Sequence, residues 1–452
     1  MSHSPFFSIV LTTYNRGSHI KPTIESVMQQ TFDDFELIVV GDGCNDSTEH
    51  VVKSLGLKKI AWKNLEQNSG SQSFPNNEGI RHSRGNWICY LGHDDIWEPD
   101  HLARLREVIL SNEGADFAIS GCIYYGPNDS ETYFVTGLFE SSDAAAHHFF
   151  PPSSLAHRRD VVDRIGWWRD PGSIRAPVDA EFLLRAANSG MRFCSTTCIT
   201  VHKFAAGHRY LFYLRPSSSE QTAVLRSFNS SSKKRNDRII EIAKKQGLFM
   251  AMTYPDFPQD EESHSRWLVG YRRGKGLALP PPRPLVSHTV IEQSDDQRGL
   301  DWHGLEHASR PFRWSGPNPR PKILIPFTGG WVRIELRLHC APSAEISVLV
   351  EDRKVDHVME VRSDAACSIV FFARLSRSDY TVLTLDTSRC HSRDERIDYG
   401  LRATGVAVSD IVVQPLSWRD LISLWLGSTL SISTGIHRAP THFAYQPVPV
   451  CT

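Results

Sequence analysis

The first quarter of the chain alternates short apolar runs with stretches whose apolar residues recur at helical spacing. Residues 8–12 and 35–40 are apolar nearly throughout, which is typical of strands buried on both faces. Residues 20–30 carry apolar side chains every three or four positions, as an amphipathic helix does. The pattern therefore predicts an α/β domain with a Rossmann-like, mostly parallel sheet that is covered by helices on both sides.

The same alternation continues as far as residue 91. It predicts further helices and strands over residues 47–55, 58–62, 73–84 and 87–91. Polar clusters follow three of the predicted strands, at residues 12–16, 41–43 and 92–95. Because ligands of such sheets bind beyond the carboxyl ends of the strands, we expect these clusters to form one site.

The pattern changes twice after residue 115. Mixed elements come first, with strands predicted over 117–125, 133–135 and 198–202 and helices over 179–189 and 218–247. A region rich in proline and charge, residues 255–284, then indicates a linker. Short strands with turn signals between them follow, over 322–327, 331–338, 345–350, 368–373, 380–386 and 405–414. Short strands at this spacing predict a β-sandwich, of a jelly-roll-like kind.

We therefore expect four parts, namely an α/β domain, a helical extension with its linker, a sandwich, and a C-terminal helix with a tail. Their predicted bounds are 1–215, 216–284, 285–416 and 417–452. Within the last part, residues 418–432 are apolar enough either to dock as a helix or to touch a membrane surface.

Composition excludes several classes of protein. A chain of 452 residues with 40% hydrophobic residues is long enough for more than one core. A net charge of −1 argues against a nucleic-acid partner. Nine cysteines without framework spacing indicate free thiols in a reducing compartment. With neither a signal peptide nor a transmembrane run expected, the prediction is a cytoplasmic protein with peripheral contact at the inner membrane left open.

Two adjacent carboxylates, Asp94 and Asp95, directly follow the strand predicted at 87–91. Paired carboxylates at the end of a buried strand are costly unless a positive group lies beside them. One interpretation is a divalent cation, Mg²⁺ or Mn²⁺, that holds a diphosphate. The alternative is a solvated turn before a helix that begins near Pro99 and Asp100.

The turn Gly41-Asp42-Gly43, which follows a predicted strand, matches the first part of the dinucleotide-binding fingerprint. That fingerprint requires a third glycine where this chain has Asp46, so a dehydrogenase is not favoured. Either the turn is a plain Asp-Gly turn, or Asp42 accepts a hydrogen bond from the edge of a base.

Four motifs in this order resemble the inverting family-two glycosyltransferases of the GT-A fold. They read SIVLTTYNR, FELIVVGDGCNDST, NNEGIRHSRGNWICYLGHDD and DAEFLLRAANSG, and the resemblance covers residues 6–210. It implies a bacterial hexosyltransferase of surface polysaccharide assembly. The implied donor is a UDP-, GDP- or dTDP-sugar used with Mn²⁺ or Mg²⁺, and the implied acceptor is a glycan or lipid-linked glycan.

The resemblance also implies roles for single residues around the donor. Thr12 and Tyr14 would border the nucleobase, and Asp42 would bind its edge. Arg16 would lie near the phosphates, and Asn77 would support the donor pocket.

Further implied roles concern the metal and the catalytic base. Asp94 would be the metal ligand, and Asp95 or His202 would compensate for a missing carboxylate. Asp179 would take the proton of the acceptor hydroxyl, with Glu181 assisting or orienting. Two alternatives stay open, a helix-capping role for Asp179 and a structural role for His202.

The acceptor side is the least constrained by the sequence. Trp167, Trp168 and Arg169 could form a sugar-stacking wall, or the two tryptophans could be core residues. In the predicted sandwich, Trp314 and Trp331 could be sugar platforms, while a structural or homodimerising role is an alternative.

Three positions depart from the family pattern. Gly41, Gly92 and Val178 stand where the family usually has carboxylates. A second hypothesis follows from these departures, namely a catalytically degenerate protein that binds glycans through its C-terminal sandwich.

Overall fold

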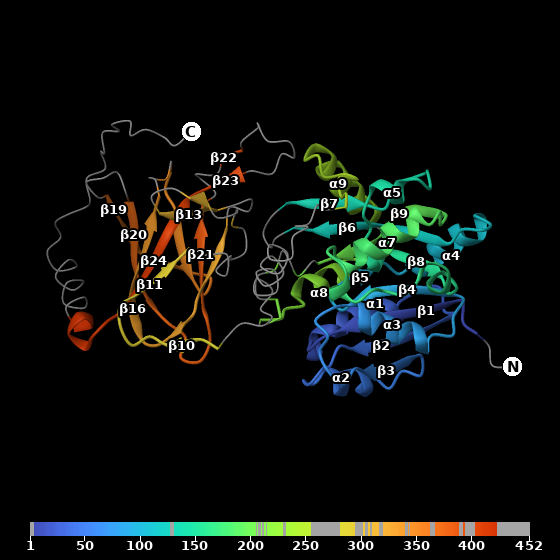
Figure 1. Cartoon of the computed structure of the whole chain (residues 1–452), viewed down its shortest axis with the longest axis horizontal. Helices are drawn as coiled ribbons and strands as arrows, with labels where there is room; N and C mark the ends of the chain where they lie inside the picture. Colours follow the sequence, from blue (N-terminus) through green and yellow to red (C-terminus); the bar gives the residue numbers. More distant parts are fainter. Residues whose placement is uncertain are drawn as a thin grey trace. The chain divides into compact units, whose positions relative to one another are not determined.

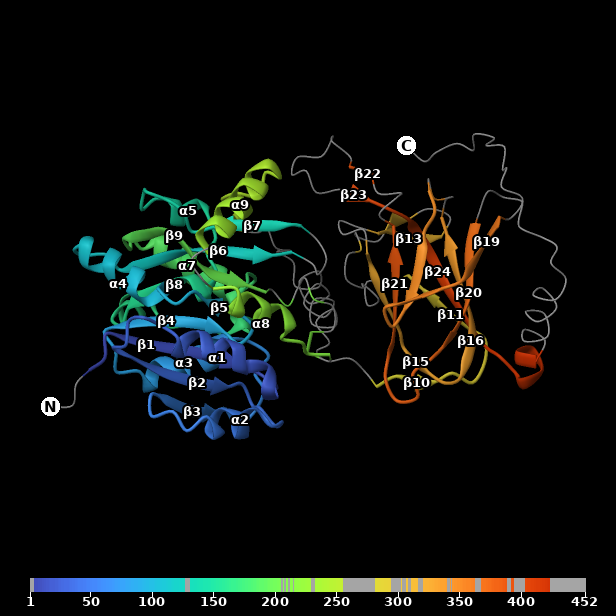
Figure 2. The same cartoon turned by 180° about the vertical axis from the view of Figure 1, so that it is seen from behind.

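The computed structural model is drawn from opposite sides in Figures 1 and 2. It describes residues 4–126, 131–204, 215–228, 232–254, 281–293, 310–315, 320–339, 344–361, 367–387 and 403–422, together with 206, 209, 212, 213, 302, 306, 307, 342, 392 and 393. The chain divides into two compact units, Met1–Trp267 and Leu268–Thr452. The inner boundaries predicted at 215, 284 and 416 remain predictions.

The first unit is built on one sheet, and the α/β prediction is confirmed. Its described strands follow the order β3-β2-β1-β4-β8-β6-β9-β5, with β7 paired to β6. Their bounds are β1 (Phe7–Thr13), β2 (Phe35–Gly41), β3 (Ile60–Asn64), β4 (Trp87–Gly92), β5 (Ile96–Trp97), β6 (Phe117–Tyr125), β7 (Tyr133–Thr136), β8 (Leu155–Arg158) and β9 (Phe193–Lys203). The half formed by β3, β2, β1 and β4 is parallel throughout, whereas β5, β7 and β8 run antiparallel to their neighbours.

Helices cover both faces of this sheet, as the apolar strands predict (Figure 1). The principal ones are α1 (Lys21–Met28), α2 (Thr48–Ser54), α3 (Ser73–His82), α4 (His101–Ser111) and α7 (Val178–Asn188). Successive residues of β1 point to opposite faces. Ile9 belongs to a cluster with residues of α1 and α4, whereas Val10 belongs to a cluster with residues of α3 and α7. The shorter helical pieces are η1 (Gly17–Ile20), α5 (Ala144–His147), η2 (Pro152–Ser154), α6 (Val161–Ile165) and η3 (Pro171–Ser173).

The helical stretch predicted at 218–247 is divided in two, α8 (Ser219–Arg226) and α9 (Ser232–Lys245). Both helices pack on the first unit. Leu225 of α8 joins a small core with Ile96 and Phe204, and Ile239 of α9 packs with Val135. The predicted linker at 255–284 lies outside the described residues except for its last four.

In the second unit the two larger sheets are antiparallel. The larger one has the order β12-β13-β24-β16-β20-β19, with β11 on β24, and the smaller one β14-β21-β17-β18. Their bounds are β11 (Thr289–Glu292), β12 (Glu306–His307), β13 (Pro311–Trp314), β14 (Lys322–Ile325), β16 (Trp331–Leu338), β17 (Ser347–Val350), β18 (Arg353–Val355), β19 (His357–Val361), β20 (Cys367–Arg374), β21 (Thr381–Asp386) and β24 (Ala407–Pro415). Two short pairs complete the described strands, the parallel pair β10 (Arg283–Pro284) with β15 (Phe327–Thr328) and the antiparallel pair β22 (Ser392–Arg393) with β23 (Ala403–Thr404). One hydrophobic cluster contains buried residues of both sheets, among them Ile334 and Leu383. The two sheets therefore share one core, and the jelly-roll-like sandwich stays a prediction.

A helical turn begins at Trp418, and positions 423–432 of the predicted apolar helix lie outside the described residues. Among the residues that are described, no helix has both the length and the apolar character that crossing a bilayer requires.

Two fully buried histidines predict how the stability of the first unit depends on pH. Burial lowers the pKa of His101 from 6.5 to about 3 and that of His157 from 6.5 to about 4. Between pH 6.5 and pH 4 the unfolded chain therefore binds more protons than the folded chain, so stability falls as the pH falls. From pH 7 to pH 5 each histidine should account for a loss of about 2 kcal/mol in unfolding free energy.

Urea unfolding at pH 7, 6 and 5 measures this slope. His101→Gln should flatten the dependence of stability on pH by about one histidine's share, measured against the control His50→Gln, a change at an exposed position. An unfolding free energy that stays constant from pH 7 to pH 5 would contradict the assignment of these two groups.

Candidate functional site

The three polar clusters meet at one edge of the sheet. Parallel pairing places Thr12 beside Val40 on one side and Gly92 on the other, so the loops after β1, β2 and β4 start at the same level. The backbone N–H of Asp42 donates to the carbonyl of Thr13 at 2.8 Å and joins two of these loops.

A pair of asparagines locks the first two loops together. Asn15 adopts a left-handed conformation (φ 45°), which asparagine tolerates better than most residues. Its Nδ2 donates to Oδ1 of Asn45 at 2.8 Å, and the backbone N–H of Asn45 donates to Oδ1 of Asn15 at 3.0 Å. The sequence analysis did not single out either residue, although asparagine beside a strand end is a recognised turn signal.

Arg16 is the most unusual side chain at this edge, because it is only 2% exposed. Its Nη1 donates to the carbonyl of Phe212 at 3.0 Å, and its guanidinium carbon lies 3.9 Å from the ring centre of Phe212 and 4.3 Å from that of Tyr213. Its Nε and Nη2 have no hydrogen-bond partner among the described residues. Burial lowers the pKa of Arg16, while Tyr213 and Asp94 act against that effect.

Buried donors without acceptors are rare and call for an explanation. Two more belong to other segments, namely the hydroxyl of Thr13 at the end of β1 and the side-chain amide nitrogen of Asn76 in α3. The half-buried ring of Tyr14 lies 6.2 Å from the ring of Tyr213. Two buried guanidinium nitrogens of Arg16 are thus left to donate to a bound anion.

Asp42 organises the loop that follows β3. Its two carboxylate oxygens accept from Nδ2 of Asn68 at 2.9 Å, from the N–H and hydroxyl of Ser69 at 2.9 and 2.6 Å, and from the N–H of Gly70 at 3.1 Å. These four donors use the acceptor capacity of a carboxylate. A direct bond from Asp42 to a base edge stays a prediction, and it would require one of these bonds to open.

Asp94 and Asp95 have opposite environments. The Asp94 carboxylate is half-buried and makes no hydrogen bond or ion pair with a described residue, while its backbone carbonyl accepts from Gln221 at 3.2 Å. Asp95 is fully buried, and its Oδ2 lies 2.9 Å from Nζ of Lys203. Ser153 and the backbone N–H of Phe204 also donate to Asp95.

Lys203 is therefore the positive group that the buried carboxylate requires, a role that was not predicted from the sequence. Burial acts to lower the pKa of Lys203, but Asp95 and Asp94 outweigh burial and raise it. A cation at Asp95 would have to compete with this lysine, so Asp94 alone presents a free carboxylate here. Lys203 follows a run, residues 193–202, that contains no Asp, Glu, Lys or Arg. This isolated lysine was the available signal of a buried positive charge.

His202 lies in a buried polar cluster of its own. Its Nε2 lies 2.9 Å from Oε1 of Glu98, and its Nδ1 lies 3.0 Å from the hydroxyl of Tyr125. Asn236 and Arg235 of α9 also contact Oε1 of Glu98, at 2.8 and 3.2 Å. Both ring nitrogens have protein partners, so this geometry favours the structural role of His202 over metal binding.

The glycines at 41 and 92 have steric explanations. A Cβ at Gly92 would lie 2.9 Å from Oδ2 of Asp95 and 3.1 Å from Oδ1 of Asp94. A Cβ at Gly41 would lie 2.3 Å from Oδ1 of Asn64 and 2.8 Å from the ring of Trp62. Carboxylates at these positions would not fit the present packing.

Helix α7 packs on the face of the sheet to which Val10 points. It carries Asp179 and Glu181 in its first turn. Oδ1 of Asp179 accepts from the N–H of Ala180 at 3.0 Å, and its Oδ2 has no partner among the described residues. The position that caps α7 is Pro177, so Asp179 is not the capping residue. One oxygen therefore remains available to act as a base.

Glu181 anchors a loop. It holds Arg185 through contacts of 2.9 and 3.1 Å and Arg169 at 3.2 Å. Arg185 in turn donates to the carbonyls of Ile165, Gly166 and Trp167. Glu181 and Arg185 thereby fix the segment that carries the predicted acceptor residues.

The two tryptophans of that segment have different environments. Trp168 is 3% exposed, stacks on Phe182 at 4.5 Å and donates to the hydroxyl of Tyr90 at 2.9 Å, so it is a core residue. Trp167 is 37% exposed. Asn77 bonds both the N–H and the carbonyl of Trp168, at 3.1 and 2.9 Å, so in this structure it positions the loop that contains both tryptophans.

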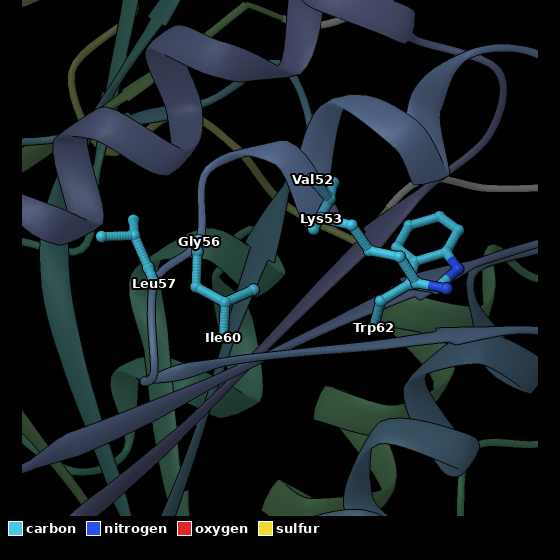
Figure 3. A pocket seen from close by; sticks show the side chains of 6 residues that line it. All are labelled: Val52, Lys53, Gly56, Leu57, Ile60 and Trp62. Carbon is cyan, nitrogen blue, oxygen red and sulfur yellow. The ribbon is translucent and has the colours of Figure 1, made fainter.

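A shallow pocket between α2 and β3 lies apart from these groups in the chain (Figure 3). It is lined by Val52, Lys53, Gly56, Leu57, Ile60 and Trp62. Its lining contains no carboxylate, and Lys53 is paired with Glu49. The candidate site is therefore the edge around Arg16 and Asp94.

Comparison with known sequences shows the family of the chain. Residues 8–166 match the model of glycosyl transferase family 2. An uncharacterized glycosyltransferase of Nostoc sp., alr2836, is 29% identical over 174 residues, which is 35% of this chain and 52% of that relative. The uncharacterized glycosyltransferase YwdF of Bacillus subtilis is 32% identical over 190 residues, which is 40% of this chain and 67% of YwdF. The chain belongs to glycosyl transferase family 2.

The matches cover only part of this chain and of its relatives. The chain spans about half the length of the Nostoc relative and 36% of a Rickettsia prowazekii relative. Among solved structures, Staphylococcus aureus TarS 1–349 with UDP-GlcNAc is 18% identical with a TM-score of 0.38, covering 59% of this chain and 71% of that one. Mannosyltransferase PcManGT from Pyrobaculum calidifontis, with GDP-Man and Mn²⁺, is 15% identical with a TM-score of 0.37, covering 61% and 84%.

The Asp95–Lys203 pair gives a prediction about stability. Lys203→Met leaves a buried carboxylate without its partner and should lower the unfolding free energy by about 3–5 kcal/mol. The double variant Asp95→Asn with Lys203→Met should recover part of this loss, because no uncompensated charge remains. Chemical denaturation of the three proteins measures both effects.

The matched control is Lys59→Met, which breaks the exposed Lys59–Asp33 pair. It should cost less than about 1 kcal/mol. Equal losses for Lys203→Met and Lys59→Met would show that the buried pair does not stabilise the loop of Asp94.

Proposed function

We propose that this protein transfers a sugar from a nucleotide-sugar donor to a hydroxyl of a glycan or lipid-linked glycan, with inversion at the anomeric carbon. The observation that carries the proposal is the juxtaposition at one sheet edge of a buried arginine with unpaired nitrogens and a free carboxylate, Asp94. The donor diphosphate would lie between them. Membership of glycosyl transferase family 2 supports this reading.

Arg16 suits a diphosphate because a guanidinium donates several hydrogen bonds to phosphate oxygens in fixed directions. Its Nε and Nη2 would bind the donor. The loops after β1 and β2, where Thr12, Tyr14 and Asp42 lie, would border the nucleoside.

The described residues contain no group of three or more His, Cys, Asp or Glu side chains that could hold a metal. They still fit a hard cation, because Mg²⁺ in phosphate sites is commonly held by one or two carboxylates together with substrate phosphates and water. Asp94 would be the protein ligand. When bound, the cation would offset the negative charge that develops on the departing diphosphate.

Asp179 would act as the base. The acceptor hydroxyl attacks the anomeric carbon while its proton passes to Oδ2 of Asp179, and the bond from that carbon to the diphosphate breaks. One displacement of this kind inverts the anomeric centre. Trp167 would offer its exposed ring to the acceptor sugar, on a loop held by Glu181 through Arg185.

A thermal-shift panel of UDP, GDP, dTDP and their sugars, with and without Mn²⁺, tests the donor site. A nucleotide at about a hundred times its dissociation constant should stabilise the chain by about 2.7 kcal/mol. Arg16→Gln should abolish the shift, and Asp94→Asn should abolish its dependence on Mn²⁺. Absence of any shift would contradict the proposal and favour the degenerate glycan-binding protein.

Asp179→Asn tests the base separately. It should lower turnover, measured as nucleotide release from the donor identified above, by about 10²–10⁴-fold. Its nucleotide-induced thermal shift should match that of the unchanged protein. Asp163→Asn is the matched control, because Asp163 is an exposed aspartate in the first turn of α6 and should retain full turnover. Loss of turnover in both variants, or in neither, would remove Asp179 from this role.

A further inference from the structure

The outer surface of the larger sheet in the second unit has unusual chemistry. Even-numbered residues of β16 point into the hydrophobic cluster, so its odd-numbered residues lie on the opposite face. We call this surface the Trp331 face and define it by Trp331, Arg333, Glu335, Arg337, Phe372 and Arg374. The outer face of an antiparallel sheet is commonly polar, yet two large aromatic side chains are exposed on this one.

The aromatic and cationic residues of the Trp331 face alternate. Trp331 is the direct cross-strand partner of Arg374, and Arg333 is the direct partner of Phe372. The two aromatics are therefore diagonal neighbours, and so are the two arginines, at a spacing of about 7–8 Å. Trp331 is 45% exposed and Phe372 is 37% exposed, so each ring is partly open to solvent.

A buried carboxylate lies beneath the arginines. Glu335 is 4% exposed although it belongs to the outer face. Its Oε2 lies 3.1 Å from Nη1 of Arg333, and its Oε1 lies 3.2 Å from Nε of Arg337 and from the hydroxyl of Ser368. Such contacts hold the guanidinium groups in place, while their remaining N–H groups stay available for a ligand.

Two of the three arginines on this face are already paired with carboxylates. Arg333 lies beside Glu335 and Glu360, and Arg337 lies beside Glu335 and Asp410. Arg374 is exposed and forms no ion pair with a described residue. Glu360, on the edge strand β19, is the exposed carboxylate close to this cluster, 3.8 Å from Nη2 of Arg333. Fixed guanidinium groups bind carboxylates and phosphates in paired hydrogen bonds, and half-exposed aromatic rings accept the apolar faces of sugar rings.

We propose that the Trp331 face binds an anionic glycan, with sugar rings on Trp331 and Phe372 and the acidic groups of the glycan on Arg333 and Arg374. The group that selects this ligand is the guanidinium of Arg374, because neither the described residues nor a neutral polysaccharide would offer it a carboxylate. That the bound glycan is the acceptor polymer rests on the proposed function, whereas the binding itself does not.

Affinity gel electrophoresis of the full-length protein tests the proposal, with polygalacturonate as the anionic probe and dextran as the neutral one. Polygalacturonate should retard the protein, and dextran should not. Trp331→Ala should weaken the retardation at least ten-fold. The matched control is Trp418→Ala, because Trp418 is 82% exposed and lies outside the sheet.

Arg374→Glu provides a second variant that does not depend on sheet packing, since the side chain is exposed. It should abolish binding of polygalacturonate and leave the melting temperature unchanged. The nucleotide-induced thermal shift should be the same in all these variants, which separates a failure of the glycan site from a failure of the donor site.

Three results would overturn the proposal. The first is retardation by dextran equal to that by polygalacturonate, which would exclude the anionic class. The second is an equal effect of Trp331→Ala and Trp418→Ala. The third is a dimer in sedimentation velocity that Trp331→Ala converts to a monomer, which would identify the occupant of the face as a second copy of the chain.

Discussion

The buried ion pair between Asp95 and Lys203 is the constraint on which the candidate site depends. It joins the loop after β4 to the end of β9, and Ser153 and the backbone of Phe204 complete the hydrogen bonds of the carboxylate. A buried carboxylate with all its partners is fixed in place, whereas one without them is strongly destabilising. With Asp95 held in this way, the neighbouring Asp94 keeps its own carboxylate free at the sheet edge.

The same edge explains one of the glycines at which the resemblance predicts a carboxylate. At Gly92 the close approach of Asp94 and Asp95 leaves no room for a side chain. Fewer carboxylates leave less negative charge to hold a cation, and Arg16 brings a fixed positive charge to the same region. The donor diphosphate would then be neutralised partly by the protein itself. In a site with several carboxylate ligands, by contrast, the bound metal would supply most of the positive charge that neutralises the diphosphate.

Hydrophobic patterning predicted the framework well, because buried strands such as β1 and alternating ones such as β16 carry their own signal. The strands expected at 117–125 and 331–338 have those bounds in the structure. Roles that depend on tertiary partners were not visible in the sequence. His202 pairs with Glu98, more than a hundred positions away, and Trp168 is buried against Phe182. The division of the helix expected at 218–247 did have a signal, the serine- and asparagine-rich stretch at 227–232.

The roles of Arg16 and Asp94 in donor binding can be tested by a crystal structure of the protein with Mn²⁺ and the nucleoside diphosphate that gives the largest thermal shift. We predict that the diphosphate lies within hydrogen-bond distance of Nε or Nη2 of Arg16, and that Asp94 ligates the metal. A nucleotide bound instead in the pocket between α2 and β3 (Figure 3), or a diphosphate that contacts neither residue, would contradict it.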